Sequence, residues 1–292
     1  MAIVVDRDTR LLVQGLTGSE GSFHGLRNKQ YGTNVVAGVT PGKGGQDVEG
    51  IPIFNTVADA VEETGANTAM VFVPARFAAD AMYEAVDSGI ETVICIAEGL
   101  PAHEMLRLYT YIRPPGVTML GPNCPGALSP GKANVGIIPA EIFSEGAIGL
   151  VSRSGTLTYQ IGHELAQLGL GNSTIVGIGG DPIVGSSFID ILERFEADDE
   201  TALVVMVGEI GGDEEEKAAR YIEASMSKPV VGYIAGFTAP PGKTMGHAGA
   251  IISGSSGTAQ GKKETLEACG VRVGTTPTEV AQLAAQVAGV AA

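Results

Sequence analysis

The stretch GKTMGHAGA, residues 242–250, places one histidine among glycines and alanines, with a lysine just before it. His247 is therefore either packing at a backbone bend or an imidazole kept accessible for chemistry. It follows the apolar run PVVGYIAG and a loop, so we expect it at the carboxyl edge of a sheet, where doubly wound folds bind ligands. Because no second histidine or cysteine stands near it in the sequence, a nucleophile is favoured over a metal ligand.

Two further stretches bring chemically useful groups to the same kind of edge. The stretch GEIGG, residues 208–212, ends another predicted strand, and its Glu209 is either a loop-capping acid or a carboxylate that holds an imidazole in one tautomer. The stretch LVSRSGTLTYQIGHEL, residues 150–165, is typical of a strand, a turn and a helix, so Ser154 and Gly155 would offer a hydroxyl and amides to a phosphoryl group. Together they predict a histidine that attacks phosphorus.

A glycine loop follows the first predicted strand. The stretch QGLTGSEGSFHG, residues 14–25, carries Gly15, Gly18 and Gly21, and opens a helix. Glycines at this spacing allow backbone N–H groups to approach a phosphate, although a plain tight turn would also explain them. His24 is expected to line this loop.

The next predicted strand indicates which phosphate ligand the loop binds. A dinucleotide site for NAD carries an acid about 20 residues beyond the glycines, to hold the ribose. Here NVVAGV runs instead into Thr40-Pro-Gly-Lys43-Gly-Gly. A lysine suits a ribose that bears a phosphate, which favours NADP or coenzyme A. The stretch GFTAPPGKT, residues 236–244, fails as a nucleoside triphosphate loop, because it is one residue too long and two prolines remove amides.

The elements that must position these residues are predicted from nine short Val/Ile-rich runs that alternate with amphipathic segments. Such runs are typical of parallel strands covered on both faces, so we expect doubly wound α/β architecture throughout. Residues 121–146 interrupt this alternation of strands and helices, because they are rich in turn residues. They are predicted to be a linker without a clear helix. Residues 213–224 and 277–290 are predicted to be helices.

Length, charge and cysteine content restrict the class of protein. The 292 residues predict two domains, and their net charge of −15 argues against nucleic acid and anionic membranes as partners. No apolar run reaches the length of a membrane span and the first residues do not resemble a signal peptide. Three cysteines without a CxxC pair predict neither disulfides nor a zinc site, so we expect a cytoplasmic location.

Seven motifs taken together carry a resemblance to a known family. In order, they are TGSEGSFH, GVTPGKGG, GPNCPG, VSRSGTLTY, GIGGDPI, GEIGG and APPGKTMGHAGAI. This set resembles the α subunits of succinyl-CoA synthetase (succinate–CoA ligase) across nearly the whole chain. The resemblance implies a Rossmann-type CoA-binding domain at residues 1–126 and a flavodoxin-like ligase domain with a phosphohistidine at residues 127–292. It also implies the reversible reaction of succinyl-CoA, nucleoside diphosphate and phosphate to succinate, CoA and nucleoside triphosphate in the citric acid cycle.

The resemblance assigns a role to each matching position. His247 is the phosphorylated residue with Glu209 beside it, Ser154 and Gly155 face its phosphate, and Tyr159 meets the carboxylate substrate. The positions implied to bind CoA are Thr17, Gly18, Ser19, Glu20, Lys43, Ile96, Ala97 and Glu98. Two departures stand out: many relatives have glutamine in place of Glu20, and the loop PPGKT has two fewer cations than the PKGKR of relatives.

The resemblance also implies what the chain lacks. The Mg-nucleotide site belongs to a β subunit with an ATP-grasp fold, in a heterodimer or a heterotetramer, and this chain itself holds no metal. Three alternatives remain open from the sequence: a malate–CoA or other acid–CoA ligase, an NADP-linked oxidoreductase permitted by Lys43, and a non-catalytic CoA-binding sensor.

Overall fold

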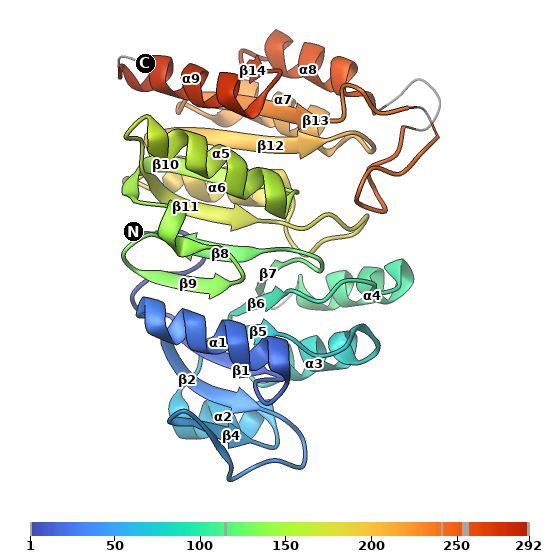
Figure 1. Cartoon of the computed structure of the whole chain (residues 1–292). Coiled ribbons are helices and arrows are strands. Elements are labelled where there is room, and N and C mark those ends of the chain that lie inside the picture. Colours follow the sequence, from blue (N-terminus) through green and yellow to red (C-terminus); the bar gives the residue numbers. More distant parts are fainter. Residues whose placement is uncertain (1, 114–115, 241, 253–256, 291–292) are drawn as a thin grey trace.

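A computed structural model describes residues 2–113, 116–240, 242–252 and 257–290. It has two seven-stranded sheets, which lie one above the other in Figure 1. The first sheet contains β1 (Arg10–Gln14), β2 (Asn34–Val39), β3 (Asp47–Val48), β4 (Ile51–Phe54), β5 (Thr68–Val71), β6 (Thr92–Cys95) and β7 (Thr118–Leu120). The second contains β8 (Gly126–Ser129), β9 (Ala133–Gly136), β10 (Glu145–Ser152), β11 (Asn172–Gly177), β12 (Leu203–Glu209), β13 (Val230–Ala235) and β14 (Arg272–Gly274).

The order of the strands confirms the expected fold class. In the first sheet the order is β3-β4-β2-β1-β5-β6-β7, and all neighbours except β3 and β4 are parallel. Its parallel strands thus follow the Rossmann order, with the first strand in the middle. The second sheet runs β14-β13-β12-β10-β11-β8-β9, and its five parallel strands follow the flavodoxin-like order.

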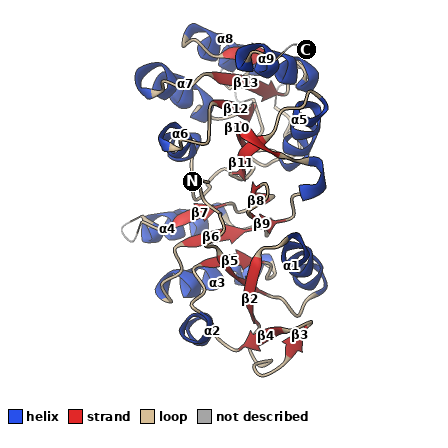
Figure 2. Cartoon of the chain, turned by 90° about the vertical axis from the view of Figure 1, so that its left-hand side faces the viewer, coloured by secondary structure: helices blue, strands red, loops and turns tan. Residues whose placement is uncertain are grey.

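Helices cover both faces of this column of strands, as Figure 2 shows. On one side lie α1 (Ser19–Tyr31), α5 (Gly155–Gln167) and α9 (Pro277–Ala288). On the other side lie α2 (Val57–Thr64), α3 (Ala75–Asp87), α4 (Ala102–Ile112), α6 (Phe188–Ala197), α7 (Glu214–Ser225) and α8 (Ala259–Ala268). Burial on both faces explains why the strands are apolar throughout rather than alternating.

Local signals in the sequence explain where several of these helices begin. The Ser154 hydroxyl accepts the Leu157 N–H at the start of α5, and Ser187 and Asp190 form a capping box at α6. Thr276 caps α9, whose first residue is Pro277, while α7 opens with three glutamates where the helix dipole favours acids. The predicted helices at residues 213–224 and 277–290 are therefore confirmed as α7 and α9.

The predicted linker at residues 121–146 was wrong in part. It contains the antiparallel hairpin β8–β9, which extends the second sheet through β11, and a 3-10 turn, η1 (Ala140–Ile142). A Cβ atom on Gly126 would lie 2.1 Å from the Val135 carbonyl oxygen, so the glycines there allow the two strands to approach. The turn residues that indicated a linker are thus part of a hairpin.

The two sheets are also joined by packing. One apolar cluster of buried side chains extends from Leu120 of the first sheet through Cys124 and Ala127 to Val176 of the second. The N-terminal residues contribute as well, because the Ser129 hydroxyl donates to the Val5 carbonyl oxygen at 2.6 Å. No helix among the described residues is long and apolar enough for a membrane span.

Candidate active site

The imidazole of His247 lies against the carboxylate of Glu209. Nδ1 is 2.6 Å from Oε2, and the Glu209 side chain is buried while that of His247 is 20% exposed. The hydrogen bond to Glu209 raises the pKa of His247 above its ordinary value of 6.5, and burial opposes this effect. If Nδ1 carries the proton that Glu209 accepts, the lone pair is on Nε2, which makes Nε2 the nucleophilic atom.

The loop that carries His247 follows β13, and Glu209 is the last residue of β12. In Figure 1 the arrowhead of β12 points to the side of the molecule where this loop lies, as does that of β2 in the first sheet. The loop can come close because glycines face it: a Cβ atom on Gly180 would lie 2.4 Å from ring atoms of His247, and one on Gly211 would lie 2.1 Å from the Gly249 carbonyl oxygen. The expected carboxyl-edge position of His247 thus agrees with the structure.

A buried arginine completes the group around Glu209. The Arg153 side chain is 9% exposed, and its Nε lies 3.4 Å from Oε1 of Glu209. Within the described residues, neither of these two atoms has a hydrogen-bond partner, so they form an ion pair without a hydrogen bond. Nη2 of Arg153 donates to the Asp181 carbonyl oxygen at 2.9 Å. Glu209 therefore lies between a cation and an imidazole.

The segment GPNCPG, which follows β7, links this group to the first sheet. Asn123 donates its backbone N–H to the Ala97 carbonyl oxygen at 3.0 Å, and its side-chain Nδ2 donates to Oδ1 of Asp181 at 3.0 Å. Its carbonyl oxygen accepts the Gly180 N–H at 3.1 Å. One residue thus contacts both the end of β6 and the segment on which His247 packs.

The start of α5 differs in detail from the arrangement expected for a phosphate. The Ser154 amide donates to Oγ of Ser152 at 3.0 Å, and its hydroxyl caps the helix, so both groups already have partners. The Gly155 amide belongs to the first turn of α5, whose N–H groups have no partner within the helix. A Cβ atom on Gly155 would lie 3.8 Å from the Tyr159 hydroxyl, and burial raises the pKa of Tyr159 to about 12.

A pocket of about 520 Å³ opens at the carboxyl edge of the first sheet. Its walls are largely apolar and include Val39, Pro41 and Phe72, while Thr17 and Gly18 of the glycine loop form one rim. Gly21 must lack a side chain, because a Cβ atom there would lie 2.3 Å from the Gly15 carbonyl oxygen. This size and lining are typical of a site for an organic ligand.

Polar groups at this pocket fit a ligand that combines a phosphate with a hydrogen-bond donor. Nζ of Lys43 lies 3.1 Å from the Thr17 hydroxyl oxygen, which brings the cation to the glycine loop. Gln14 is 2% exposed and its Nε2 donates to the Ala81 carbonyl oxygen at 2.8 Å. Among the described residues Oε1 of Gln14 has no partner, so this pocket-lining side chain offers a buried acceptor to a ligand.

The other positions expected at the CoA site lie nearby but do not line this pocket. Ser19 and Glu20 open α1, with the Glu20 side chain 74% exposed. Ile96, Ala97 and Glu98 follow β6, where the Ile96 amide donates to the Val71 carbonyl oxygen at 3.2 Å. The structure therefore brings these residues to the same edge of the sheet as the glycine loop.

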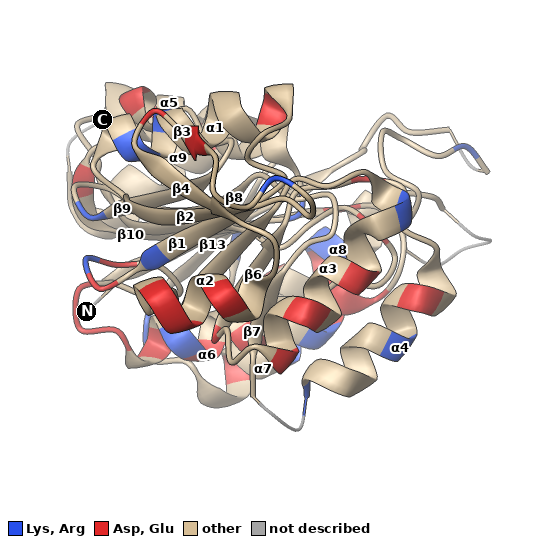
Figure 3. Ribbon diagram, turned by 90° about the horizontal axis from the view of Figure 1, so that it is seen from below, with Lys and Arg blue, Asp and Glu red and all other residues tan. Residues whose placement is uncertain are grey.

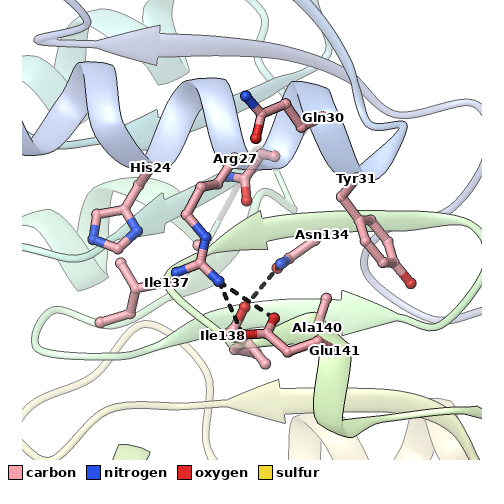
Figure 4. A pocket seen from close by; sticks show the side chains of 11 residues that line it. His24, Arg27, Gln30, Tyr31, Asn134, Ile137, Ile138, Ala140 and Glu141 are labelled. Atoms are coloured by element: carbon pink, nitrogen blue, oxygen red, sulfur yellow. Dashed lines mark hydrogen bonds and ion pairs between the residues drawn. The ribbon is translucent and has the colours of Figure 1, made fainter.

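A smaller hollow of about 260 Å³ lies between α1 and residues 134–141, as Figure 4 shows. Arg27 and Glu141 form an ion pair at 3.3 Å across it, and Asn134 donates to the Ile138 carbonyl oxygen at 2.9 Å. His24 lines this hollow rather than the pocket at the glycine loop, and its ring stacks on Phe72 with centroids 5.4 Å apart.

Charge is distributed unevenly around these sites. Acidic residues colour several outer turns of α2 and α3 in Figure 3, in keeping with the net charge of −15. An anionic ligand must therefore be bound by a few placed cations and by backbone amides. Within the described residues no cluster of three or more His, Cys, Asp or Glu side chains fits a metal ion.

The sequence pattern did not identify Arg153, Asn123 and Asp181 as parts of the site. Arg153 stands directly before Ser154, at the end of an apolar run. A charged residue at the end of a predicted strand could have identified it as a candidate site residue. Asn123 and Asp181 occur in turn-rich segments. Asn and Asp are common in turns for structural reasons, so their presence there does not indicate a functional site. Their roles depend on contacts between segments far apart in the chain.

Comparison with known families divides the chain in two. Residues 6–99 match the CoA binding domain family, and residues 151–272 match the CoA-ligase family. The first match contains the glycine loop and Lys43, and the second contains Arg153, Glu209 and His247. The first match supports CoA rather than NADP as the ligand of this half of the chain.

Proteins with similar sequences agree with this division. The chain is 58% identical over 287 residues to succinate–CoA ligase (ADP-forming) subunit alpha 2 of Archaeoglobus fulgidus, covering 98% of this chain and 100% of that protein. It is 57% identical over 289 residues to succinate–CoA ligase (ADP-forming) subunit alpha of Aquifex aeolicus, covering 98% and 95%.

A more distant solved structure shares the fold. The ATP citrate lyase of Methanosaeta concilii, a D541A mutant in complex with (3S)-citryl-CoA, superposes with a TM-score of 0.88 at 23% identity. The match covers 98% of this chain and 50% of that one, so this chain spans about half of its length.

Proposed function

The chain belongs to the family of succinate–CoA ligase α subunits, and we propose that His247 carries the phosphoryl group in its reaction. It acts in an acid–thiol ligase that interconverts succinyl-CoA, nucleoside diphosphate and phosphate with succinate, CoA and nucleoside triphosphate. The observation that carries the role of His247 is its 2.6 Å contact with the buried carboxylate of Glu209.

The reaction proceeds in three transfers. Phosphate attacks the thioester carbonyl of succinyl-CoA and displaces the thiolate of CoA, which leaves succinyl phosphate. Nε2 of His247 attacks the phosphorus atom, and succinate leaves with the electrons of the broken P–O bond. A nucleoside diphosphate oxygen then takes the phosphoryl group and the imidazole is restored. Glu209 holds the Nδ1–H and stabilises the positive charge of the phosphorylated ring.

The first turn of α5 supports the phosphoryl group in this proposal. The helix dipole and the Gly155 amide face developing negative charge, while Ser154 shapes the turn through its cap. Tyr159, whose hydroxyl lies near Gly155, contacts the carboxylate of succinate. Because burial keeps this phenol protonated, it can donate a hydrogen bond to the substrate.

The CoA-binding half uses the edge of the first sheet. Lys43 binds the ribose phosphate, the residues Thr17, Gly18, Ser19 and Glu20 surround the other phosphates, and Ile96, Ala97 and Glu98 line the channel that leads toward His247. We assign residues 1–126 to this domain and residues 127–292 to the ligase domain. Asn123, which contacts both Ala97 and Asp181, lies where the two sites meet.

A β subunit of ATP-grasp fold supplies the Mg-nucleotide, in a heterodimer or a heterotetramer. The names of the relatives as α subunits and as ADP-forming enzymes support this partner and ADP as the acceptor.

The thiols of Cys95, Cys124 and Cys269 form no disulfide bond with one another. Free thiols are typical of a reducing compartment, which supports a location in the cytoplasm.

Mass mapping of an acid-labile phosphate tests the proposal. The chain is incubated with γ-labelled ATP, with and without its β subunit, and digested peptides are analysed. We expect label on His247 only when the β subunit is present. Labelling of another residue would reject His247 as the carrier, and labelling of the isolated chain would place the nucleotide site in this polypeptide.

A further inference from the structure

A fully buried ion pair lies behind Glu209. Lys262 of α8 and Glu215 of the first turn of α7 are both 0% exposed, and Nζ of Lys262 bonds to Oε2 of Glu215. The remaining bonds of this ammonium group go to the carbonyl oxygens of Glu209, at 2.9 Å, and Gly211, at 2.5 Å. All three donors of the lysine are therefore used.

Glu215, the other member of the ion pair, also bonds to the backbone of Glu209. Oε1 of Glu215 accepts the backbone N–H of Glu209 at 3.0 Å. The N–H and the C=O that flank the Cα atom of Glu209 are thus held by one ion pair. These two bonds fix the backbone from which the Glu209 side chain departs toward His247.

The position of Glu209 in the sheet explains why it needs such partners. The ladder between β10 and β12 ends with the pair Ser152 and Val207. The peptide groups of Glu209 lie beyond that pair, so no residue of β10 is in position to form ladder hydrogen bonds with them. A Cβ atom on Gly208 would lie 2.5 Å from Cγ of Glu215, so the glycine allows this carboxylate to reach the strand.

Energetics indicate that stability alone does not explain this ion pair. Taking two charges out of water is costly, and replacing a buried ion pair by apolar side chains of similar volume is often neutral or stabilising. Apolar side chains would fill the same space between α7, α8 and β12. They would leave the peptide groups of Glu209 without these bonds.

We propose that Lys262 and Glu215 are positioning residues that hold Glu209 against the imidazole of His247. The inference rests on the proposed role of His247 as the phosphoryl carrier. The two residues act through the backbone of Glu209 and do not touch the reacting atoms. A small shift in a group that orients a nucleophile is enough to reduce a rate on the order of 100-fold.

The test compares single and double variants in the complex with the β subunit. Each of Lys262→Met and Glu215→Leu leaves one buried charge unpaired, so both should lower the melting temperature. The double variant removes both charges and should recover part of the loss, because the peptide groups of Glu209 still lack these partners. We expect the double variant to remain slow in labelling His247 from γ-labelled ATP, on the order of 100-fold below wild type, with CoA affinity unchanged. Lys217→Met, which removes two exposed ion pairs, with Asp213 and Glu214 at the start of α7, is the matched control.

A second pair of variants tests the hydrogen bond itself. Glu215→Gln and Glu215→Leu remove the same charge, but only the glutamine keeps an oxygen that accepts the Glu209 N–H. We expect Glu215→Gln to label His247 faster than Glu215→Leu. Equal rates would contradict the inference, and so would a double variant that is both stable and labelled at the wild-type rate.

An NMR titration of His247 in the isolated chain gives a readout that does not depend on activity. The charged groups that act on this imidazole are Glu209, Arg153 and Asp181, and the double variant changes none of them. If Glu209 is displaced, the pKa of His247 should fall toward its ordinary value, whereas an unchanged pKa would reject the inference. Failure of the wild-type complex to label His247 would instead reject the proposed function, and the titration would still decide the positioning role.

Discussion

The Nδ1 atom of His247 lies 2.6 Å from Oε2 of Glu209, although the two residues are 38 positions apart in the sequence. The contact joins a residue at the end of β12 to the loop that follows β13. In the proposed mechanism this contact makes the carboxylate the orienting group and Nε2 the attacking atom.

Replacing His247 by Asn should abolish net ligase activity and leave CoA binding unchanged. The proposed nucleophile lies in a loop beside the second sheet and the proposed CoA pocket lies at the edge of the first, so loss of the imidazole should not alter the pocket. Calorimetric titration of CoA and a coupled turnover assay measure the two quantities. Turnover retained in this variant would remove the phosphohistidine from the mechanism.

Replacing Glu209 by Gln should change the pH dependence of His247 phosphorylation. The protonated imidazole has no lone pair on Nε2, so the rate rises as pH passes upward through the pKa of His247, which Glu209 raises. In the variant this midpoint should move to lower pH, and the rate at high pH should fall roughly 10- to 100-fold because a charge-assisted hydrogen bond is lost.

Single-turnover labelling from pH 6 to pH 9, with the exposed Glu264→Gln as the control, measures both effects on His247. A midpoint that does not move would show that Glu209 is only a loop-capping acid.

Replacing Gly180 by Ala should displace the imidazole without unfolding the chain. A Cβ atom at this position would lie 2.4 Å from ring atoms of His247, closer than any real contact. We expect phosphorylation to slow on the order of 100-fold. Gly249→Ala is the matched control in the same region, because its nearest neighbours would lie at 3.6 Å or more. Equal labelling rates in the two variants would mean that the ring adjusts freely.

Replacing Lys43 by Ala should weaken CoA binding by roughly 1.5–3 kcal/mol, the value of a charge-assisted contact to phosphate. Binding of CoA that lacks the ribose phosphate should change much less. Lys263→Ala, on the second half of the chain, serves as the control for loss of a positive charge. The same loss of affinity for both ligands would show that Lys43 does not bind that phosphate.

Much of the fold could be predicted because its main strands carry a local signal. The nine Val/Ile-rich runs all correspond to strands, since burial on both faces demands continuous apolar residues. The missed strands are β3, β4, β8, β9 and β14, which are two to four residues long. Such short segments show no hydrophobic periodicity by which a strand could be predicted. In β8 and β9, the glycines that allow close pairing resemble those of a linker.

The sequence by itself determined the fold class, the family and the residue types placed at the ends of strands, because these depend on local composition and on the order of motifs. Only the tertiary structure decided that Glu209 bonds to His247, that Arg153 and Asn123 belong to the same site, and that His24 does not line the pocket at the glycine loop. The ion pair behind Glu209 joins residues 47 positions apart, and neither carries a motif of its own. Such contacts depend on how helices pack against a twisted sheet, which no local pattern of side chains specifies.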